Sequence, residues 1–348
     1  MENRDGPKPE GQCAESTRRR MLSRRRSTGR RVRILVTGVA GFIGSTTAEH
    51  LLDQGHEVVG LDNLASGRFE NVPSRATFVE GDCADQDLVR SLGTFEACVH
   101  FAARIEPGDS MVSPEVFFSN NVAATLRMLE TLTAQGLDKF IFSSSCAVYG
   151  NQDEMPIDED RPVHPHSPYG QTKLMIEQAL AWMVRCGRVK AASLRYFNAA
   201  GGTRAHPERH HPEIHLIPIA LQAAVGQRGH LDIFGSDYPT IDGTCVRDYV
   251  HVSDLANAHA LAITALDHHD SLTLNLGTGT GSSNRQVVDM VKHVTGRDFT
   301  VRYVGRRAGD PAAAVAGGRR AREVLGWDPS SSDLEHIVRD AWSAYQTN

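Results

Sequence analysis

Short apolar runs alternate with helical patterns along the chain from Val32 onwards. Such a rhythm of strands and helices is typical of an α/β fold, in which helices cover both faces of a doubly wound parallel sheet. We predict helices over Thr46–Gln54, Val116–Gln135 and Tyr169–Cys186, and strands over Val32–Thr37, Glu57–Asp62, Ala76–Glu80, Ala97–Phe101, Lys139–Ser143 and Ala191–Tyr196.

The regular alternation ends near Asn198, where Gly201–Pro212 is rich in glycine, histidine and proline. The later elements are shorter and mixed. We therefore predict a nucleotide-binding domain over residues 32–198 and a smaller mixed substrate domain over residues 199–348. Parts of 245–270 are expected to return to the first domain.

Residues 1–31 hold ten Lys or Arg and four Asp or Glu, which leaves a net charge of −11 on the remainder of the chain. The segment is rich in arginine, serine, glycine and proline, and we predict a disordered basic tail. An acidic folded part argues against nucleic-acid binding. No run reaches the roughly 20 apolar residues of a membrane span.

Six cysteines are scattered without a CxxC pair, so neither disulfides nor a zinc site is expected. We predict a cytoplasmic protein that uses no metal.

The first predicted strand leads into Gly38, Gly41 and Gly44, spaced G-x-x-G-x-x-G before a helix. Glycines at such a turn let backbone amides approach a pyrophosphate at the helix N-terminus. The next strand ends at Asp62, 18 residues past Gly44, close to the ~20 residues expected of an acid that binds the adenosine ribose. A carboxylate there favours NAD over NADP, because it would repel an added phosphate.

Tyr169 and Lys173 lie four residues apart on a predicted helix and so share a face. Ser167 and Pro168 form a helix-start signal just before them. A nearby ammonium and a positive nicotinamide ring would both lower the pKa of the tyrosine and make it a better base. Ser145 lies just after the predicted parallel strand Lys139–Ser143, and a serine there can relay a proton to Tyr169.

These residues resemble the extended short-chain dehydrogenase/reductase family, with its Rossmann-type fold, and within it the UDP-glucose 4-epimerases. The resemblance extends from Val32 to Trp327. Its further motifs are Asp62–Leu64, His100–Ala103, Leu194–Asn198, Phe234–Thr240, Gly243–Val252, Asn275–Gly279 and Arg306–Pro311.

The resemblance implies NAD-dependent epimerisation at C4 of a UDP-hexose through a transient 4-keto sugar, in a homodimer. Tyr169 would be the acid/base, with Ser145 and Lys173 as its partners. The implied NAD contacts are Gly38, Gly41, Phe42, Ile43, Gly44, Asp62, Asn63, Asp82, Cys83, Phe101, Ala102, Ala103, Asn120, Lys173 and Phe197. The implied UDP-sugar contacts are Ser145, Tyr169, Asn198, His215, Phe234, Arg247, Arg307, Asp310 and Ala314.

Position 314 is implied to decide the sugars accepted. A tyrosine there is typical of relatives restricted to UDP-glucose and UDP-galactose, whereas a smaller residue, as here, is typical of those that also accept N-acetylated sugars. Two further departures from the family pattern are Arg104, where Lys or Tyr is common nearby, and Gly317, where Asp is common.

Other functions stay open at this stage. A 4,6-dehydratase is disfavoured because no acid occupies Ser145–Ala147. Cys146 matches the cysteine acid/base of 3,5-epimerases, and a UDP-glucuronate 4-epimerase is a further alternative. An NAD-binding sensor without catalytic activity would be expected to have lost Tyr169 or Lys173, and the chain keeps both.

Overall fold

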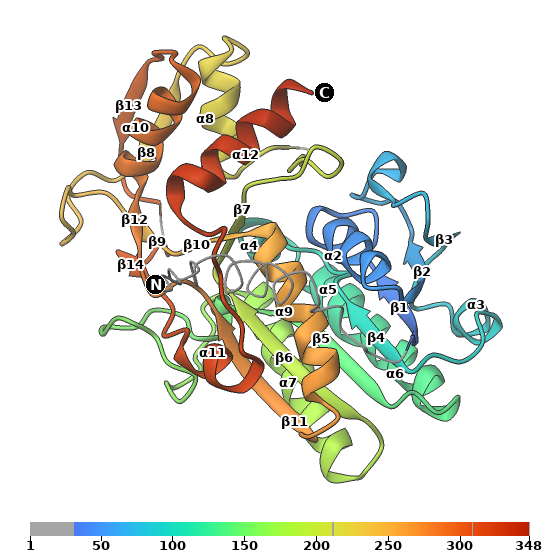
Figure 1. The fold of residues 1–348 in the computed structure, drawn as a ribbon. Coiled ribbons are helices and arrows are strands. Elements are labelled where there is room, and N and C mark those ends of the chain that lie inside the picture. The colour runs from blue at the N-terminus through green and yellow to red at the C-terminus, as the bar shows by residue number, and fades with distance from the viewer. Residues whose placement is uncertain (1–30, 211, 308, 348) are drawn as a thin grey trace, which may run out of the picture. The chain divides into compact units, whose positions relative to one another are not determined.

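The computed structural model describes residues 31–210, 212–307 and 309–347 (Figure 1). The predicted tail, apart from Arg31, lies outside these residues. Seven strands form one parallel sheet in the order β11-β6-β5-β4-β1-β2-β3, which confirms the predicted doubly wound fold. The strands are β1 (Arg33–Thr37), β2 (Glu57–Asp62), β3 (Thr77–Glu80), β4 (Ala97–His100), β5 (Lys139–Ser145), β6 (Lys190–Tyr196) and β11 (Ser271–Leu276).

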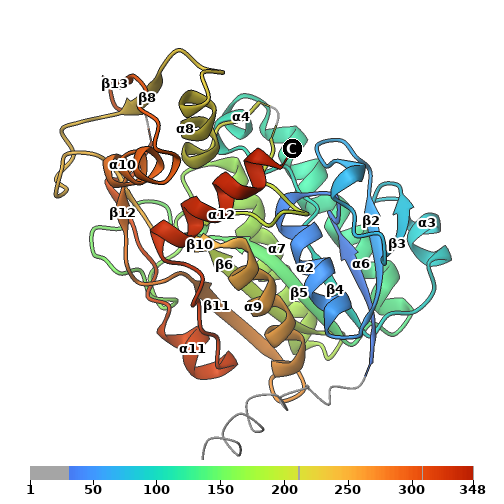
Figure 2. The same ribbon diagram turned by 45° about the horizontal axis from the view of Figure 1, so that its top comes forward.

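Helices cover both faces of this sheet (Figures 1 and 2). Successive residues of β1 show why, since Ile34 and Val36 belong to one buried cluster and Leu35 to another. The first cluster includes side chains of α2 (Phe42–Asp53), α9 (Val252–Ala265) and α11 (Arg319–Leu325). The second includes side chains of α3 (Gln86–Ser91), α6 (Ala124–Ala134) and α7 (Pro168–Arg185).

Two predicted helix boundaries differ from the structure. Helix α2 begins at Phe42 rather than Thr46, because the end of the glycine loop already forms its first turn. The segment predicted as one helix over Val116–Gln135 is divided into three consecutive pieces. They are α5 (Pro114–Phe117), a π-helical stretch η2 (Phe118–Ala123) and α6, and they follow α4 (Pro107–Val112).

The sheet also takes strands and helices from the C-terminal part of the chain. Strand β11 pairs with β6 beyond the predicted return segment 245–270, and α11 packs on the same face as α9. The remaining elements belong to the C-terminal part of the chain, and most of them contribute side chains to a third buried cluster. They are β7 (Asn198–Ala200), α8 (Leu216–Ala224), β8 (Leu231–Phe234), β9 (Val246–Arg247), β10 (Tyr249–His251), β12 (Ser282–Ser283), α10 (Asn284–Thr295), β13 (Val301–Val304), β14 (Ala313–Ala314) and α12 (Leu334–Gln346).

Three short parallel or mixed pairings join these elements. Strand β7 pairs with β10, β8 pairs with β13, and β9 lies between β12 and β14. Two short 3₁₀ helices, η1 (Phe69–Asn71) and η3 (Cys146–Val148), follow β2 and β5. Among the residues that the structure describes, no helix combines the length and the apolar character needed to cross a membrane.

A buried histidine at the end of β4 gives the fold a testable response to acid. His100 forms hydrogen bonds with Thr37 Oγ1 (2.6 Å) and Thr125 Oγ1 (2.8 Å). Burial, helped by the charge of Lys173, lowers the pKa of His100 to about 3. The unfolded chain takes up this proton near pH 6.5, so the stabilisation is complete above that pH and is lost as the pH falls towards 3.

We therefore expect His100→Gln to flatten the fall of the unfolding free energy between about pH 6.5 and 3. Glutamine keeps a donor and an acceptor for the two threonines but does not titrate. Urea unfolding at a series of pH values measures the slope. A variant whose slope equals that of the wild type would contradict this assignment.

Candidate active site

The glycine loop lies at the carboxyl end of β1, next to β4, where the strand order reverses. Ligands bind at such switch points in open α/β sheets. Gly38 has φ +72°, and a Cβ there would lie 2.7 Å from the backbone N of Ala102. A Cβ at Gly44 would lie 2.1 Å from the Gly38 carbonyl oxygen. Both positions therefore require glycine. At Gly38 the backbone of the loop lies against the backbone of Phe101 and Ala102, which follow β4.

Helix α2 begins directly after this loop with Gly41 as its N-cap and no side-chain cap. Its first amides are therefore available to an anion, and the helix dipole favours one. Asp62 lies buried beside the loop, and its carboxylate accepts hydrogen bonds from the backbone N–H of Ala40 (2.9 Å) and of Leu64 (2.8 Å). The loop and the acid are thus held together as one unit.

The other predicted cofactor contacts lie around the same strand ends. Asn63 donates a hydrogen bond to Asp82 (3.1 Å), and burial raises the pKa of the neighbouring Cys83 to about 12. Phe101 follows β4, and its ring lies 4.7 Å from that of His259. Asn120 is half-buried in η2. Their contacts with NAD stay predictions.

Tyr169 and Lys173 lie in the first turns of α7. Ser167 caps this helix by accepting the backbone N–H of Gly170 (3.2 Å), as the sequence predicts. The ammonium nitrogen of Lys173 lies 5.8 Å from the Tyr169 ring centroid and donates to the Ser143 carbonyl oxygen (2.8 Å). The i, i+4 spacing therefore brings the two side chains to one place, at the end of β5.

The expected electrostatic effect of Lys173 on Tyr169 is not found in the protein by itself. Burial raises the pKa of Tyr169 to about 12, and a hydrogen bond with Ser145 acts in the opposite direction. Burial lowers the pKa of Lys173 to about 7 against the charge of Glu177. The prediction that Lys173 lowers the tyrosine pKa is thus wrong here, because desolvation dominates both groups.

Three consecutive serines end β5, and their partners separate their roles. Ser143 bonds to Tyr196, and Ser144 donates to Glu177 (2.5 Å). Ser145 is half-buried, accepts the N–H of Ala147 (3.1 Å) and bonds to Tyr169. Of the three, Ser145 is therefore the serine placed to share a substrate with Tyr169.

A buried ion pair that we did not predict supports this arrangement. Arg195 of β6 donates to both carboxylate oxygens of Glu177 on α7, from Nε (2.9 Å) and from Nη2 (2.5 Å). Both side chains are 8% exposed. Arg195 also donates to Tyr149 (2.9 Å), which in turn donates to Asn275 (2.7 Å). The only sequence signal was that Glu177 follows Lys173 by four residues and so shares its helix face.

A second buried acid, also missed, organises the predicted UDP side. Asp248 accepts hydrogen bonds from the backbone N–H (2.9 Å) and hydroxyl (2.7 Å) of Thr278, and from the N–H groups of Gly279 and Ala316 (3.1 Å each). Burial raises its pKa against these bonds. Asp248 therefore joins three loops directly beside Arg247.

The structure brings several predicted UDP contacts together. Arg247 donates to the Pro311 carbonyl (2.9 Å) and lies 3.8 Å from Asp310. The Arg307 guanidinium lies 4.3 Å from the Phe234 ring centroid, and both residues line a cavity of about 390 Å³. In β14, Ala314 pairs in register with Arg247.

Two more predicted contacts flank this region. Asn198 in β7 donates its backbone N–H to the Asp248 carbonyl (3.0 Å). His215 precedes α8, and its Nδ1 lies 3.2 Å from both Glu208 and Glu213. Burial would lower the pKa of His215, but the hydrogen bond with Glu213 and the charge of Glu208 raise it to about 9.

The departures from the family pattern have local explanations. Burial raises the pKa of Cys146 to about 11, and the residue packs against an apolar cluster that includes Phe197, so an acid/base role is not favoured. The backbone of Arg104 is bonded on both sides by Asn121 (2.8 and 3.0 Å). A Cβ at Gly317 would lie 2.0 Å from Asp158 Oδ1, so the segment before α11 has no room for a side chain there.

Comparison with known proteins gives consistent results. Residues 34–277 match the model of the NAD dependent epimerase/dehydratase family. The chain is 44% identical over 318 residues to the UDP-glucose 4-epimerase of Streptomyces lividans, covering 90% of this chain and 96% of the relative.

Two solved structures are also similar. The UDP-glucose 4-epimerase of Brucella ovis in complex with NAD has a TM-score of 0.86 at 43% identity, covering 89% of this chain and 97% of that one. The UDP-Glc/GlcNAc 4-epimerase of Campylobacter jejuni has a TM-score of 0.80 at 37% identity, covering 91% and 99%.

The buried ion pair provides a test of how α7 is held. Arg195→Met leaves the Glu177 carboxylate buried without its partner, and we expect a loss of ~3–5 kcal/mol in the free energy of unfolding. The double variant with Glu177→Met removes both charges and should recover much of this loss. Urea unfolding measures both. Arg319→Met removes the exposed pair with Glu323 and serves as the control with little expected change. A single variant as stable as that control would refute the role given to the pair.

Proposed function

The chain belongs to the NAD dependent epimerase/dehydratase family, and we propose that it interconverts UDP-glucose and UDP-galactose by epimerisation at C4. One observation carries the residue assignment. The phenol of Tyr169, the hydroxyl of Ser145 and the ammonium of Lys173 converge at the end of β5, beside the glycine loop. A base, a proton relay and a cofactor-binding turn are the parts that this reaction needs.

The residues of the switch point fit NAD. Gly38 and Gly44 have no room for a side chain, the α2 N-terminus offers uncapped amides, and Asp62 presents a carboxylate at the end of β2. Bound NAD supplies the acceptor and donor of the C4 hydride, so that no net oxidation occurs. We propose that Asp62 contacts the adenosine ribose and that the α2 amides hold the pyrophosphate.

The chain's own residues handle the proton. In this proposal Tyr169, through Ser145, takes the proton of the 4-hydroxyl as the 4-keto sugar forms, and returns it after the sugar has turned. Lys173 is buried and donates a hydrogen bond to the Ser143 carbonyl oxygen. This bond keeps the ammonium group close to the Tyr169 ring.

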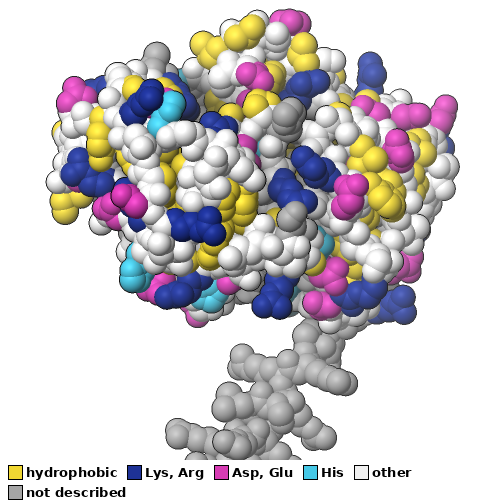
Figure 3. All heavy atoms as spheres, turned by 90° about the horizontal axis from the view of Figure 1, so that it is seen from above, with side chains coloured by type: hydrophobic (Ala, Val, Ile, Leu, Met, Phe, Trp, Pro, Cys, Tyr) yellow, Lys and Arg dark blue, Asp and Glu magenta, His cyan; other side chains and the backbone are white. Residues whose placement is uncertain are grey.

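The diphosphate is proposed as the fixed anchor about which the sugar swings. Arg247 and Arg307 supply guanidinium groups suited to phosphate oxygens, and Asp310 an acceptor for a ribose hydroxyl. Figure 3 shows Lys and Arg side chains interspersed with Asp and Glu on the face seen from above.

We also propose that the enzyme acts in the cytoplasm as a homodimer. Exposed apolar side chains on neighbouring helices support the dimer, namely Leu126 of α6 (40% exposed) and Met175 and Trp182 of α7 (37% and 64%). Burial of such side chains against a second copy would remove apolar surface from water.

Replacing the proposed base gives the direct test. Tyr169→Phe should lower turnover of UDP-galactose by at least ~10²–10⁴-fold, because a general acid–base group contributes about that much. NAD content of the purified protein should be unchanged. NMR reads the configuration at C4, and Tyr303→Phe, at an exposed tyrosine, is the matched control. Turnover near that of the wild type would end the assignment of Tyr169.

The sugar specificity is proposed to depend on Ala314. This residue packs against the cluster that holds Phe197 and Cys146, next to the proposed site of the sugar, and a methyl group leaves room for an acetamido substituent. The similar Campylobacter jejuni enzyme is a UDP-Glc/GlcNAc 4-epimerase. We propose that this chain also interconverts UDP-N-acetylglucosamine and UDP-N-acetylgalactosamine.

We expect the wild type to act on both sugar pairs and Ala314→Tyr to lose mainly the N-acetylated pair. The reason is steric, since overpacking a filled site costs ~1–3 kcal/mol. Ala313→Tyr adds the same bulk on the other face of β14 and is the control. No activity of the wild type on UDP-N-acetylgalactosamine would refute this specificity.

A further inference from the structure

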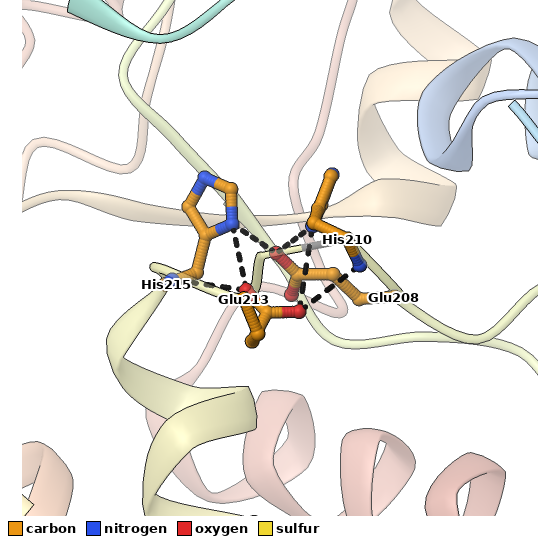
Figure 4. A group of neighbouring side chains, drawn as sticks. All are labelled: Glu208, His210, Glu213 and His215. Atoms are coloured by element: carbon orange, nitrogen blue, oxygen red, sulfur yellow. Dashed lines mark hydrogen bonds and ion pairs between the residues drawn. The ribbon is translucent and has the colours of Figure 1, made fainter. Parts of the chain in front are cut away.

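Four side chains of types that bind metal ions converge in the loop before α8. One of them, His215, is also a predicted UDP-sugar contact. We call Glu208, His210, Glu213 and His215 the histidine–glutamate cluster (Figure 4). One donor atom from each side chain can be chosen so that all four lie within 4.8 Å of one another. The chain supplies them in the spacing Glu-x-His-x-x-Glu-x-His, so a single short loop encloses the cluster.

The separations between these atoms correspond to one coordination sphere. His215 Nδ1 lies 3.2 Å from a carboxylate oxygen of Glu208 and 3.2 Å from one of Glu213. His210 Nδ1 lies 3.8 and 3.6 Å from oxygens of the same two residues. Four ligands at ~2.0–2.1 Å from a tetrahedral Zn²⁺ are about 3.3 Å apart, so small side-chain shifts complete the sphere.

Hydrogen bonding alone does not satisfy the cluster. His210 Nδ1 is buried and forms no hydrogen bond within the part of the chain that the structure describes. Its distances to both carboxylates are too long for one. The side chains of Glu208 and Glu213 are each only 5% exposed. Two buried carboxylates need compensating positive charge, which a protonated His215 supplies in the metal-free protein and which a divalent cation between them would supply in its place.

The surrounding groups orient the ligands as metal sites require. The Glu213 carboxylate accepts backbone N–H bonds from His210 (3.1 Å), Ile214 (3.0 Å) and His215 (3.0 Å). These bonds fix the carboxylate and leave one of its about four lone-pair sites for a cation. A cavity of about 300 Å³ lined by Glu208, His210 and Glu213 gives a path of entry.

We propose that the histidine–glutamate cluster is a structural site for one divalent transition-metal cation, and that this cation is Zn²⁺. Two imidazole nitrogens and two carboxylate oxygens are a ligand set that zinc takes, and four protein ligands leave no open position for catalysis. The alternative is a latch of His215 hydrogen-bonded to Glu213, which leaves His210 Nδ1 unused.

The position of the site gives it a consequence for binding, and this step rests on the proposed function. His215 is the N-cap of α8, and Glu213 lines the cavity of about 390 Å³ that Phe234 and Arg307 share. A metal that fixes this loop fixes one wall of the proposed UDP pocket. Its removal should therefore raise KM for the UDP-sugar and leave kcat nearly unchanged.

The test is the metal content of the untagged full-length chain after dialysis against Zn²⁺ and then against buffer. We expect about one zinc per chain by elemental analysis, a visible spectrum of tetrahedral Co²⁺ after substitution, and a lower Tm after chelation that added Zn²⁺ restores. His210→Gln should weaken zinc binding by at least ~10–100-fold. His293→Gln, at an exposed histidine of α10, is the control and should bind zinc like the wild type.

Two results would overturn the site. One is a wild-type chain without zinc after this dialysis, and the other is equal zinc in the wild type and in His210→Gln. If that variant fails to fold, the Co²⁺ spectrum of the wild type decides, because its intensity distinguishes a four-coordinate protein site from six-coordinate Co²⁺ in water. These measurements do not involve turnover, so they stand apart from the test of the epimerase assignment. An unchanged KM with zinc present would leave the metal site in place and refute only its effect on the pocket.

Discussion

The bidentate ion pair between Glu177 and Arg195 is the interaction on which the proposed catalytic centre depends. It joins α7 to β6 inside the protein, and Ser144 and Tyr149 extend it to β5 and to the loop after it. Taking two charges out of water is costly, and their mutual attraction repays this cost only when further hydrogen bonds satisfy both groups. The pair therefore contributes more to the orientation of α7 than to the stability of the protein. It fixes α7 relative to β6, and Tyr169 and Lys173 on the same helix lie at the end of β5.

Asp248 fulfils a similar role on the other side of the site. Its carboxylate receives four hydrogen bonds from the loops around Thr278 and Ala316, so that segments distant in sequence meet beside Arg247. In both places a buried acid is held by donors from several elements. Both halves of the site thus rely on buried charges that are fully hydrogen-bonded, and such networks rigidify a structure. The sugar and the cofactor are proposed to meet between these two fixed points.

The fold was accessible from the sequence because its signals are local. Each strand is a short apolar run, and Gly38, Gly44 and Ser167 mark turns and a helix start through backbone constraints that a sequence displays. The resemblance to a family supplied the site residues. Glu177, Arg195 and Asp248 were missed because their partners lie far away in sequence, and nothing local distinguishes a buried acid from an exposed one.

The histidine–glutamate cluster was missed for another reason. A zinc site was sought only among cysteines, although the repeated Glu-x-His spacing of Glu208 to His215 was visible in the chain. Spacing alone would not have sufficed, because a loop can carry such residues pointing outward. The burial of Glu208 and Glu213 makes the pattern meaningful.

The pKa values of Tyr169 and Lys173 show which protonation states the protein favours by itself. Burial opposes charge on both groups, so it raises the pKa of the phenol to about 12 and lowers that of the ammonium to about 7. A phenolate and an ammonium formed together would stabilise each other in the same low-dielectric surroundings that disfavour either one alone. A positive ring bound beside the phenol would shift Tyr169 towards the phenolate. The burial that makes the base weak in the free protein is thus what makes it responsive to the charge of a bound cofactor.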